Sequence, residues 1–183
     1  MIAVLDADQL EKTKFYVFRQ GRLLDRQLYD YFFGHGSREA CLKALFAYQN
    51  TDGGFGNAIE PDISTPESSG IGAETALYTL DLLDCHEEKY ISGLVQWVNS
   101  NMNEEGYLNH PPKSLLDYPH QPWWEAPDKV RIFALAGILY HWEYQDSALF
   151  EKVSSFAHHY VQPEGDLYYS YPYLIYLKYC RGE

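Results

Sequence analysis

Acidic and aromatic side chains gather in two long loops of the sequence. The first loop, 57–72, is rich in Pro, Ser and Gly and contains Glu60 and Asp62. The second loop, 109–127, contains a denser set: Asp117, Tyr118, His120, Trp123, Trp124 and Glu125. Paired carboxylates near a histidine suit general acid–base catalysis, and their oxygens suit a divalent cation. Aromatic faces suit stacking on sugars or stabilisation of a carbocation.

These loop residues predict a ligand pocket, because long loops in compact domains often carry function. Eight residues are candidates, the first four for catalysis and the last four for ligand contact: Glu60, Asp62, His120, Glu125, Tyr118, Trp123, Trp124 and Phe55. A purely structural interpretation is also available. In it, prolines and tryptophans fasten the second loop to the core while the acids cap helices. The sequence leaves both interpretations open.

Other groups of metal-binding or anion-binding residue types are weaker. The run 84–86 is Asp-Cys-His, and consecutive side chains on one helix point about 100° apart, which suits a single metal ion poorly. The adjacent histidines at 158–159 also point in different directions, so they suit a single metal ion poorly. Three arginines at helical spacing, Arg19, Arg22 and Arg26, favour surface salt bridges over a diphosphate site. We therefore predict no metal site and no cofactor, with a divalent cation at the loop carboxylates left open.

Charge and composition exclude several classes of partner. Lys and Arg number 14 against 26 Asp and Glu, a net charge of −12, which repels nucleic-acid phosphates and anionic membranes. No uncharged apolar run approaches about 18 residues, so we predict no membrane span. Three cysteines without a CxxC pair indicate reduced thiols and a cytoplasmic protein. The expected partner is a small apolar or carbohydrate ligand, and a homo-oligomer is left open.

Helical periodicity dominates the elements that must position these loops. Apolar residues at three- and four-residue steps predict helices over 9–33, interrupted at Gly21, followed by three helical hairpins at about 37–84, 90–142 and 149–180. Within these hairpins we expect Ser37 to be an N-cap and helices to cover 74–83 and 171–179. Sustained alternation with a period of two is weak outside 167–173. An acidic-glycine turn recurs in each hairpin, at Gly54, Gly106 and Gly165. A period near 50 residues is typical of stacked helical pairs. The sequence thus predicts one all-α domain over 1–183.

The first turn also carries a family resemblance. The segment 47–56, Ala-Tyr-Gln-Asn-Thr-Asp-Gly-Gly-Phe-Gly, resembles the glutamine–aspartate–glycine turn of the α/α-toroid superfamily. Terpenoid cyclases, protein prenyltransferase β subunits and several polysaccharide-degrading enzymes belong to that superfamily. Gln96 with Glu105–Tyr107 resembles a degenerate second copy, and Gln162–Gly165 a fainter third. Three runs are similar to uncharacterised bacterial prenyltransferase-like proteins: Arg22–Arg26, Gly53–Asp62 and Tyr118–Trp124.

The resemblance implies a toroid-like stack of helical hairpins around a cavity for an isoprenoid-type or other apolar ligand. An enzyme of this type would be a cyclase or transferase. The Asp-x-Asp-Asp run of class II terpenoid cyclases is missing from the sequence, and the run 84–86 lacks the zinc-ligand spacing of protein prenyltransferases. The chain is also short for a full ring, so we expect a partial or open one. A carbohydrate-active toroid and a non-catalytic protein-interaction module are the alternatives.

Overall fold

All regular structure in the described residues is helical, as predicted. The computed structural model describes residues 6–161 and 167–180, and within these ranges there are α-helices and short 3₁₀ helices but no β-strand. The all-α fold class is therefore confirmed. The ring-like arrangement of the hairpins stays a prediction, and the third predicted turn, at Gly165, lies outside the described residues.

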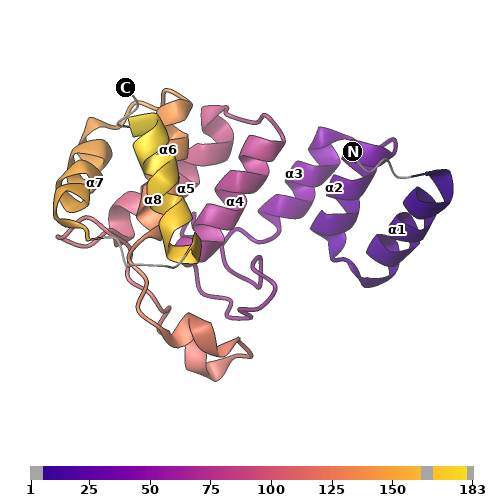
Figure 1. The fold of residues 1–183 in the computed structure, drawn as a ribbon, viewed down its shortest axis with the longest axis horizontal. Coiled ribbons are helices and arrows are strands. Elements are labelled where there is room, and N and C mark those ends of the chain that lie inside the picture. Colours follow the sequence, from indigo (N-terminus) through magenta and orange to yellow (C-terminus); the bar gives the residue numbers. More distant parts are fainter. Residues whose placement is uncertain (1–5, 162–166, 181–183) are drawn as a thin grey trace. The chain divides into compact units, whose positions relative to one another are not determined.

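The chain divides into two compact units, Met1–Ala47 and Tyr48–Glu183. One domain over 1–183 stays a prediction. The first unit contains α1 (Ala7–Gln20), α2 (Leu23–Phe33) and α3 (Arg38–Phe46), seen in Figure 1 in indigo and violet.

Local capping explains the helix starts and breaks of the first unit. The side chain of Asp6 accepts a hydrogen bond from the Gln9 amide at 2.9 Å, and the Gln9 side chain accepts one from the Asp6 amide at 2.9 Å. Gly21 separates α1 from α2, where the sequence predicted the interruption. Ser37 accepts a hydrogen bond from the Ala40 amide at 3.2 Å, which confirms it as the predicted N-cap of α3.

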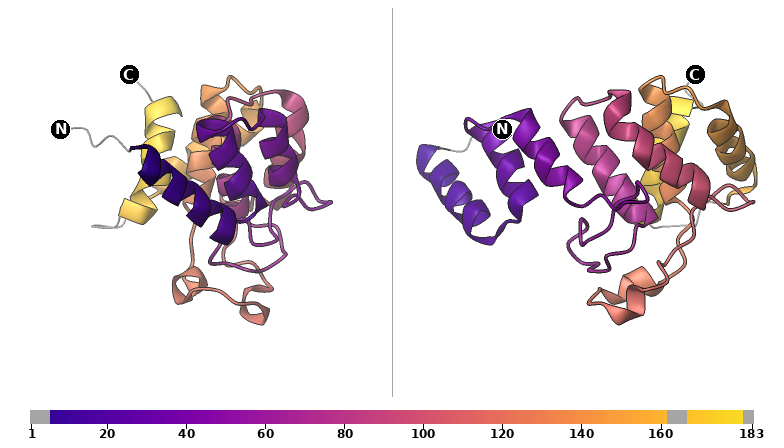
Figure 2. Two further views of the ribbon diagram at one scale, coloured as in Figure 1. Left: turned by 90° about the vertical axis from the view of Figure 1, so that its right-hand side faces the viewer. Right: turned by 180° about the vertical axis from the view of Figure 1, so that it is seen from behind.

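The second unit contains five helices among its described residues: α4 (Gly70–Leu82), α5 (Glu88–Asn101), α6 (Arg131–His141), α7 (Ser147–His159) and α8 (Leu167–Cys180). Helix α6 contacts α4, α7 and α8, and every residue from Arg131 to Leu139 is buried (Figures 1 and 2). A helix that is apolar on all sides forms the centre of a core. Here it supports the two helices, α4 and α8, that border the candidate site.

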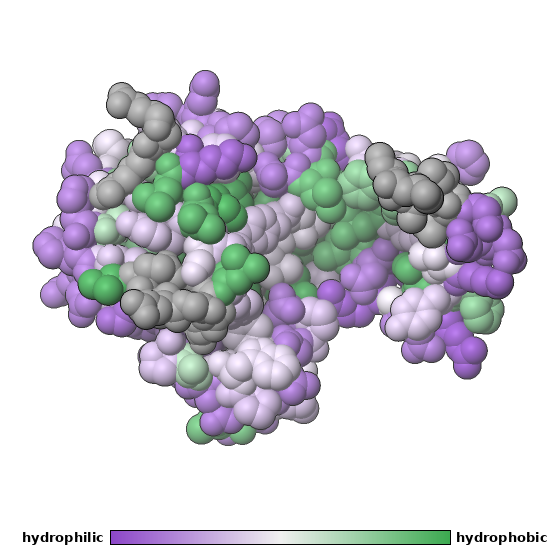
Figure 3. All heavy atoms as spheres, in the orientation of Figure 1, coloured by the Kyte–Doolittle hydropathy of each residue, from purple (hydrophilic) through white to green (hydrophobic). Residues whose placement is uncertain are grey.

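Two helices of the second unit begin earlier than the sequence predicted. Helix α4 was predicted from Glu74, but Ser69 caps it by accepting a hydrogen bond from the Gly72 amide at 3.1 Å. Helix α8 was predicted from Tyr171, with the period-two alternation over 167–173 noted before it, but the helix begins at Leu167. Helix α8 also carries exposed apolar side chains such as Leu174, which is 54% exposed, and apolar residues gather over it in Figure 3.

The predicted repeat of the glycine turn is present in two copies, in a different register. Gly53 and Gly106 both have positive φ, +91° and +95°, and their amides donate to Asn50 and Asn103 at 3.0 and 3.1 Å. The equivalent of Gly106 is thus Gly53, where the sequence comparison had used Gly54. An isolated antiparallel bridge closes each turn, between Gln49 and Phe55 and between Met102 and Leu108.

The register places Met102, and not Gln96, at the position of the motif glutamine. In the first copy Gln49 donates through Nε2 to the carbonyl oxygen of Gly53 at 2.9 Å, so the glutamine stabilises its own turn. A side chain added at Gly53 would meet Gly93 of α5, and one added at Gly106 would meet Lys152 of α7. Each turn therefore packs on the backbone of the next helical pair.

Replacing Gly53 with alanine should lower the free energy of unfolding by about 1–3 kcal/mol. The backbone there has φ of +91°, and the new Cβ would clash with the carbonyl oxygen of Gly93. Urea denaturation followed by circular dichroism measures the loss. Gly70→Ala is the matched control, because its added Cβ would meet no atom closer than 3.4 Å. Equal stability of the two variants would contradict the assigned turn conformation.

Candidate functional site

The two long loops of the second unit lie side by side, as the sequence predicted. The Ser64 amide donates to the Pro119 carbonyl oxygen at 2.9 Å, and the Gln121 amide donates to the Asp62 carbonyl oxygen at 3.0 Å. Both loops lie beyond the same end of the helices, and the second carries two 3₁₀ helices, 115–117 and 122–125 (Figures 1 and 2). Backbone pairing thus brings the acids of the first loop to the tryptophans of the second.

A pocket of about 780 Å³ lies between these loops, one face of α4 along its length, and the first turns of α8. Its described lining combines acidic, aromatic and aliphatic side chains: Glu60, Asp62, Ile71, Glu74, Thr75, Tyr78, Thr79, Leu82, Trp123, Trp124, Tyr168 and Tyr171. Four of the eight candidates predicted from the sequence are in this set: Glu60, Asp62, Trp123 and Trp124. The pocket is large enough for a small organic molecule.

Hydrogen bonds hold the two loop acids in place at the pocket. Asp62 accepts from the indole nitrogen of Trp124 at 2.7 Å, and Glu60 accepts from the Thr75 hydroxyl at 3.2 Å. Trp124 is only 4% exposed and belongs to an apolar cluster with neighbouring isoleucine and leucine side chains, so it has a structural role as well. Trp123, in contrast, is 55% exposed and lines the pocket with an accessible indole.

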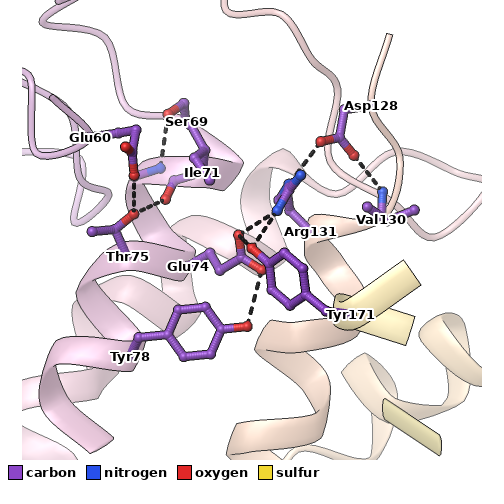
Figure 4. A network of polar contacts seen from close by, with 11 residues as sticks. Glu60, Ser69, Ile71, Glu74, Thr75, Tyr78, Asp128, Val130, Arg131 and Tyr171 are labelled. Carbon is purple, nitrogen blue, oxygen red and sulfur yellow. Dashed lines mark hydrogen bonds and ion pairs between the residues drawn. The ribbon is translucent and has the colours of Figure 1, made fainter. Parts of the chain in front are cut away.

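A buried ion-pair network closes the inner side of the pocket (Figure 4). Arg131 donates from Nη1 to Glu74 Oε2 at 2.8 Å and from Nε to Asp128 Oδ2 at 2.8 Å. All three side chains are less than 5% exposed. Tyr171 receives a hydrogen bond from Arg131 at 2.7 Å and donates one to Glu74 at 3.1 Å, while Tyr78 donates to Glu74 at 3.4 Å. The network links α4, α6 and α8.

Aromatic rings cover the guanidinium group of this network. The Arg131 Cζ atom lies 4.4 Å from the ring centre of Tyr168 and 5.6 Å from that of Tyr171. Nη2 of Arg131 has no hydrogen-bond partner within the described residues, so ring contacts surround that side of the group. Burial raises the pKa of both tyrosines above the usual value, which keeps their hydroxyls protonated as donors.

Burial raises the pKa of Glu74 from 4.5 to about 7, against the lowering effect of the Arg131 charge. Repulsion from the nearby Asp128 carboxylate adds a smaller effect in the same direction as burial. A carboxylic acid with a pKa near 7 can both donate and accept a proton at neutral pH. Glu74 is therefore the lining residue best suited to proton transfer.

The raised pKa of Glu74 makes stability depend on pH. The folded protein holds this proton more tightly than the unfolded chain, so the free energy of unfolding should fall as pH rises from about 4.5 to about 7, by up to about 3 kcal/mol. Urea denaturation at several pH values measures the slope. Glu74→Gln should remove it, and Glu151→Gln, at an exposed position of α7, should leave it. Parallel pH profiles for wild type and Glu74→Gln would contradict this account.

The other four sequence candidates lie outside the described lining of the pocket. His120 forms hydrogen bonds with the Tyr118 carbonyl oxygen at 2.7 Å and with Glu125 Oε1 at 3.2 Å, and these two contacts raise its pKa. Glu125 and Tyr118 are exposed side chains of the second loop. Phe55 is fully buried, because the first turn packs it into the core. The predicted pairing of His120 with a carboxylate is thus made with Glu125.

Sequence reasoning missed the lining residues that come from helices. Glu74, Tyr78, Tyr168 and Tyr171 line the pocket, but none of them is among the eight candidates, and neither is Arg131. One signal was available: Glu74 and Arg131 are single charges within apolar helical segments, and buried charges require partners. Pairing one acid with one base on two apolar helices would have pointed to this site.

Three further findings bear on the site. No cluster of three or more His, Cys, Asp or Glu side chains suited to a metal ion occurs in the part of the chain that the structure describes. Within the same residues, none of the helices has the length and apolar character needed to cross a membrane. Comparison with family models, curated proteins and solved structures found no match to this chain. Its function must therefore be argued from the pocket.

Proposed function

We propose that this protein binds a small organic ligand with a large apolar surface. In the enzymatic form of the proposal, the protein also transforms that ligand. The isoprenoid-type class follows from the resemblance of the first turn to the α/α-toroid superfamily. One observation carries the proposal: five aromatic side chains and three carboxyl groups converge on a single pocket of about 780 Å³. Ligand sites are commonly apolar clefts with a few polar groups that fix orientation.

The polar groups of the pocket suit a reaction that moves a proton. Glu74, with a pKa near 7, is a proton donor or acceptor at neutral pH, and Arg131 holds its Oε2 atom at 2.8 Å. Tryptophan and tyrosine faces stabilise positive charge that develops on a bound hydrocarbon. A cyclase- or transferase-like activity is the enzymatic form of this proposal.

Calorimetric titration with geraniol, an uncharged isoprenoid alcohol, tests the proposal. We expect a Kd of about 0.1–1 mM, as suits a ligand of this size in a preformed pocket. Trp123→Ala should weaken binding about fivefold or more, since this exposed indole lines the pocket without belonging to the core. Melting curves of the variant should match those of the wild type.

Trp142→Ala provides the matched control. Trp142 stacks on His86 and donates to Asp81 at 3.0 Å, and it is not part of the described lining. Geraniol binding should be unchanged in this variant. Absence of geraniol binding, or equal weakening by the two tryptophan variants, would overturn the proposal.

A carbohydrate ligand is the second candidate, favoured by one specific observation. Trp123 lines the same pocket as Asp62 and Glu60 with an exposed indole, and sugars commonly stack on such a ring while carboxylates accept their hydroxyl hydrogens. Titration with cellobiose under the same conditions separates the candidates. Cellobiose binding that Trp123→Ala abolishes, without geraniol binding, would replace the first proposal with the second.

A further inference from the structure

We infer that the ligand of this pocket carries a positive charge, as an organic ammonium group. This inference rests on the proposed function and narrows its ligand class. Two observations support it: the kinds of side chain that face the pocket, and the way in which the Arg131 guanidinium behind Glu74 is held.

The charges that face the pocket are acidic. Glu60, Asp62 and Glu74 line it, while Lys, Arg and His do not occur among its described lining residues. Arg131 contacts the lining residue Glu74, but its side chain is 3% exposed and its charge is opposed by Glu74 and by Asp128, each at 2.8 Å. The pocket therefore presents a net negative potential to a ligand, strengthened by low-dielectric walls.

The rings of the pocket suit the same charge. Aromatic faces attract cations, and cages of such rings are a common way to recognise quaternary ammonium groups. The protein uses this contact itself, since the Arg131 guanidinium lies 4.4 Å from the Tyr168 ring centre. Trp123 is 55% exposed and lines the same pocket as Asp62, and tryptophan is the ring that attracts cations most strongly.

Anionic ligands are opposed by the same side chains. A diphosphate in this pocket would face three carboxyl groups without a basic side chain in the described lining. The whole chain adds to this repulsion with its net charge of −12. A ligand with an apolar body and an ammonium head satisfies both the rings and the acids.

Three probes of similar shape and different charge test the inference by NMR titration. They are 4-hydroxyphenyltrimethylammonium, its uncharged carbon analogue 4-tert-butylphenol, and 4-hydroxybenzenesulfonate. We expect the cation to bind about tenfold more tightly than the uncharged analogue, and the anion to bind more weakly than either. The preference for the cation should shrink as salt rises, because part of it is electrostatic.

Asp62→Asn locates the source of the preference. Asparagine keeps an oxygen that can accept the Trp124 hydrogen bond, now 2.7 Å long at Asp62, so the variant should fold, as melting curves will check. Affinity for the cation should fall about fivefold more than affinity for 4-tert-butylphenol does. Glu151→Gln removes the same charge at an exposed position of α7 and should change neither.

The possible outcomes distinguish failure of the inferred ammonium ligand from failure of the proposed function. If 4-tert-butylphenol binds as tightly as the cation, the inference fails and the proposed apolar pocket stands. If neither probe binds, the proposed function fails and the inference fails with it. If Glu151→Gln weakens cation binding as much as Asp62→Asn does, the preference reflects the overall charge of the protein, and the inference is wrong.

Discussion

Replacing Arg131 with methionine is expected to lower the free energy of unfolding by about 3–5 kcal/mol. The change leaves Glu74 and Asp128, both less than 5% exposed, as buried carboxyl groups without a cation. It also removes the hydrogen bond of 2.7 Å to Tyr171, which ties α6 to α8. Urea denaturation at pH 7 measures the loss.

A triple variant tests whether the cost comes from the unpaired charges. In Glu74→Gln/Asp128→Asn/Arg131→Met, uncharged groups of similar size replace the whole ion-pair network. Removing both partners of a buried pair is much less costly than removing one, so at least half of the lost stability should return. A triple variant no more stable than Arg131→Met would show that packing, and not charge, accounts for the effect.

Lys129→Met serves as the control on the same unit. This lysine is half-exposed, and its Nζ atom lies 3.9 Å from Glu105. Pairs of this kind contribute about 1 kcal/mol or less, since solvent screens them. A loss for Lys129→Met close to that for Arg131→Met would mean that the result reflects net charge and not burial.

Helix positions were predictable from the sequence because local chemistry decides them. Gly21 separates α1 from α2, and Ser37 caps α3, both through contacts between residues at most four apart. The errors arise where a different local signal competes. The alternation over 167–173 resembles that of a strand, yet packing against α6 makes the segment helical.

The loop part of the site was also predictable, and the helical part was not. Glu60, Asp62 and Trp124 stand out because two long loops combine carboxylates with aromatic side chains, and the structure brings them together. Glu74 and Arg131 are 57 positions apart in sequence, so their contact depends on how α4 packs on α6. Such pairing follows from tertiary structure, which periodicity within one helix does not report.

A third limit on prediction from the sequence concerns the register of the repeated turn. The sequence comparison found the glycine turns but aligned Gly106 with Gly54, because the pair Gly53-Gly54 offers two registers. Backbone conformation separates them: only Gly53 and Gly106 have positive φ among the described glycines. The register therefore required dihedral angles, which residue types alone do not provide.

Replacing Phe133 with alanine should cost about 3–5 kcal/mol of unfolding free energy. Phe133 is fully buried on α6, and its ring centre lies within 5.4 Å of rings from two other helices. The contacts reach Phe156 and Tyr160 from the α7 segment, and Tyr173 and Tyr176 from α8. Removing the ring leaves a cavity that these larger side chains fill only in part, and it loosens α8, which carries Tyr168 and Tyr171 to the pocket.

Because α8 lines the pocket, the same variant should also weaken geraniol binding, although Phe133 lies outside the described lining. Phe133→Leu, which keeps most of the buried volume, should lose less stability, about 1–2 kcal/mol, and retain binding. Leu116→Ala, at a loop position that is 76% exposed, should change stability by no more than about 0.5 kcal/mol. If Phe133→Ala lost stability but bound geraniol normally, the pocket would not depend on how α8 packs on α6. If the variant kept both its stability and its geraniol binding, the ring cluster would contribute little to the core.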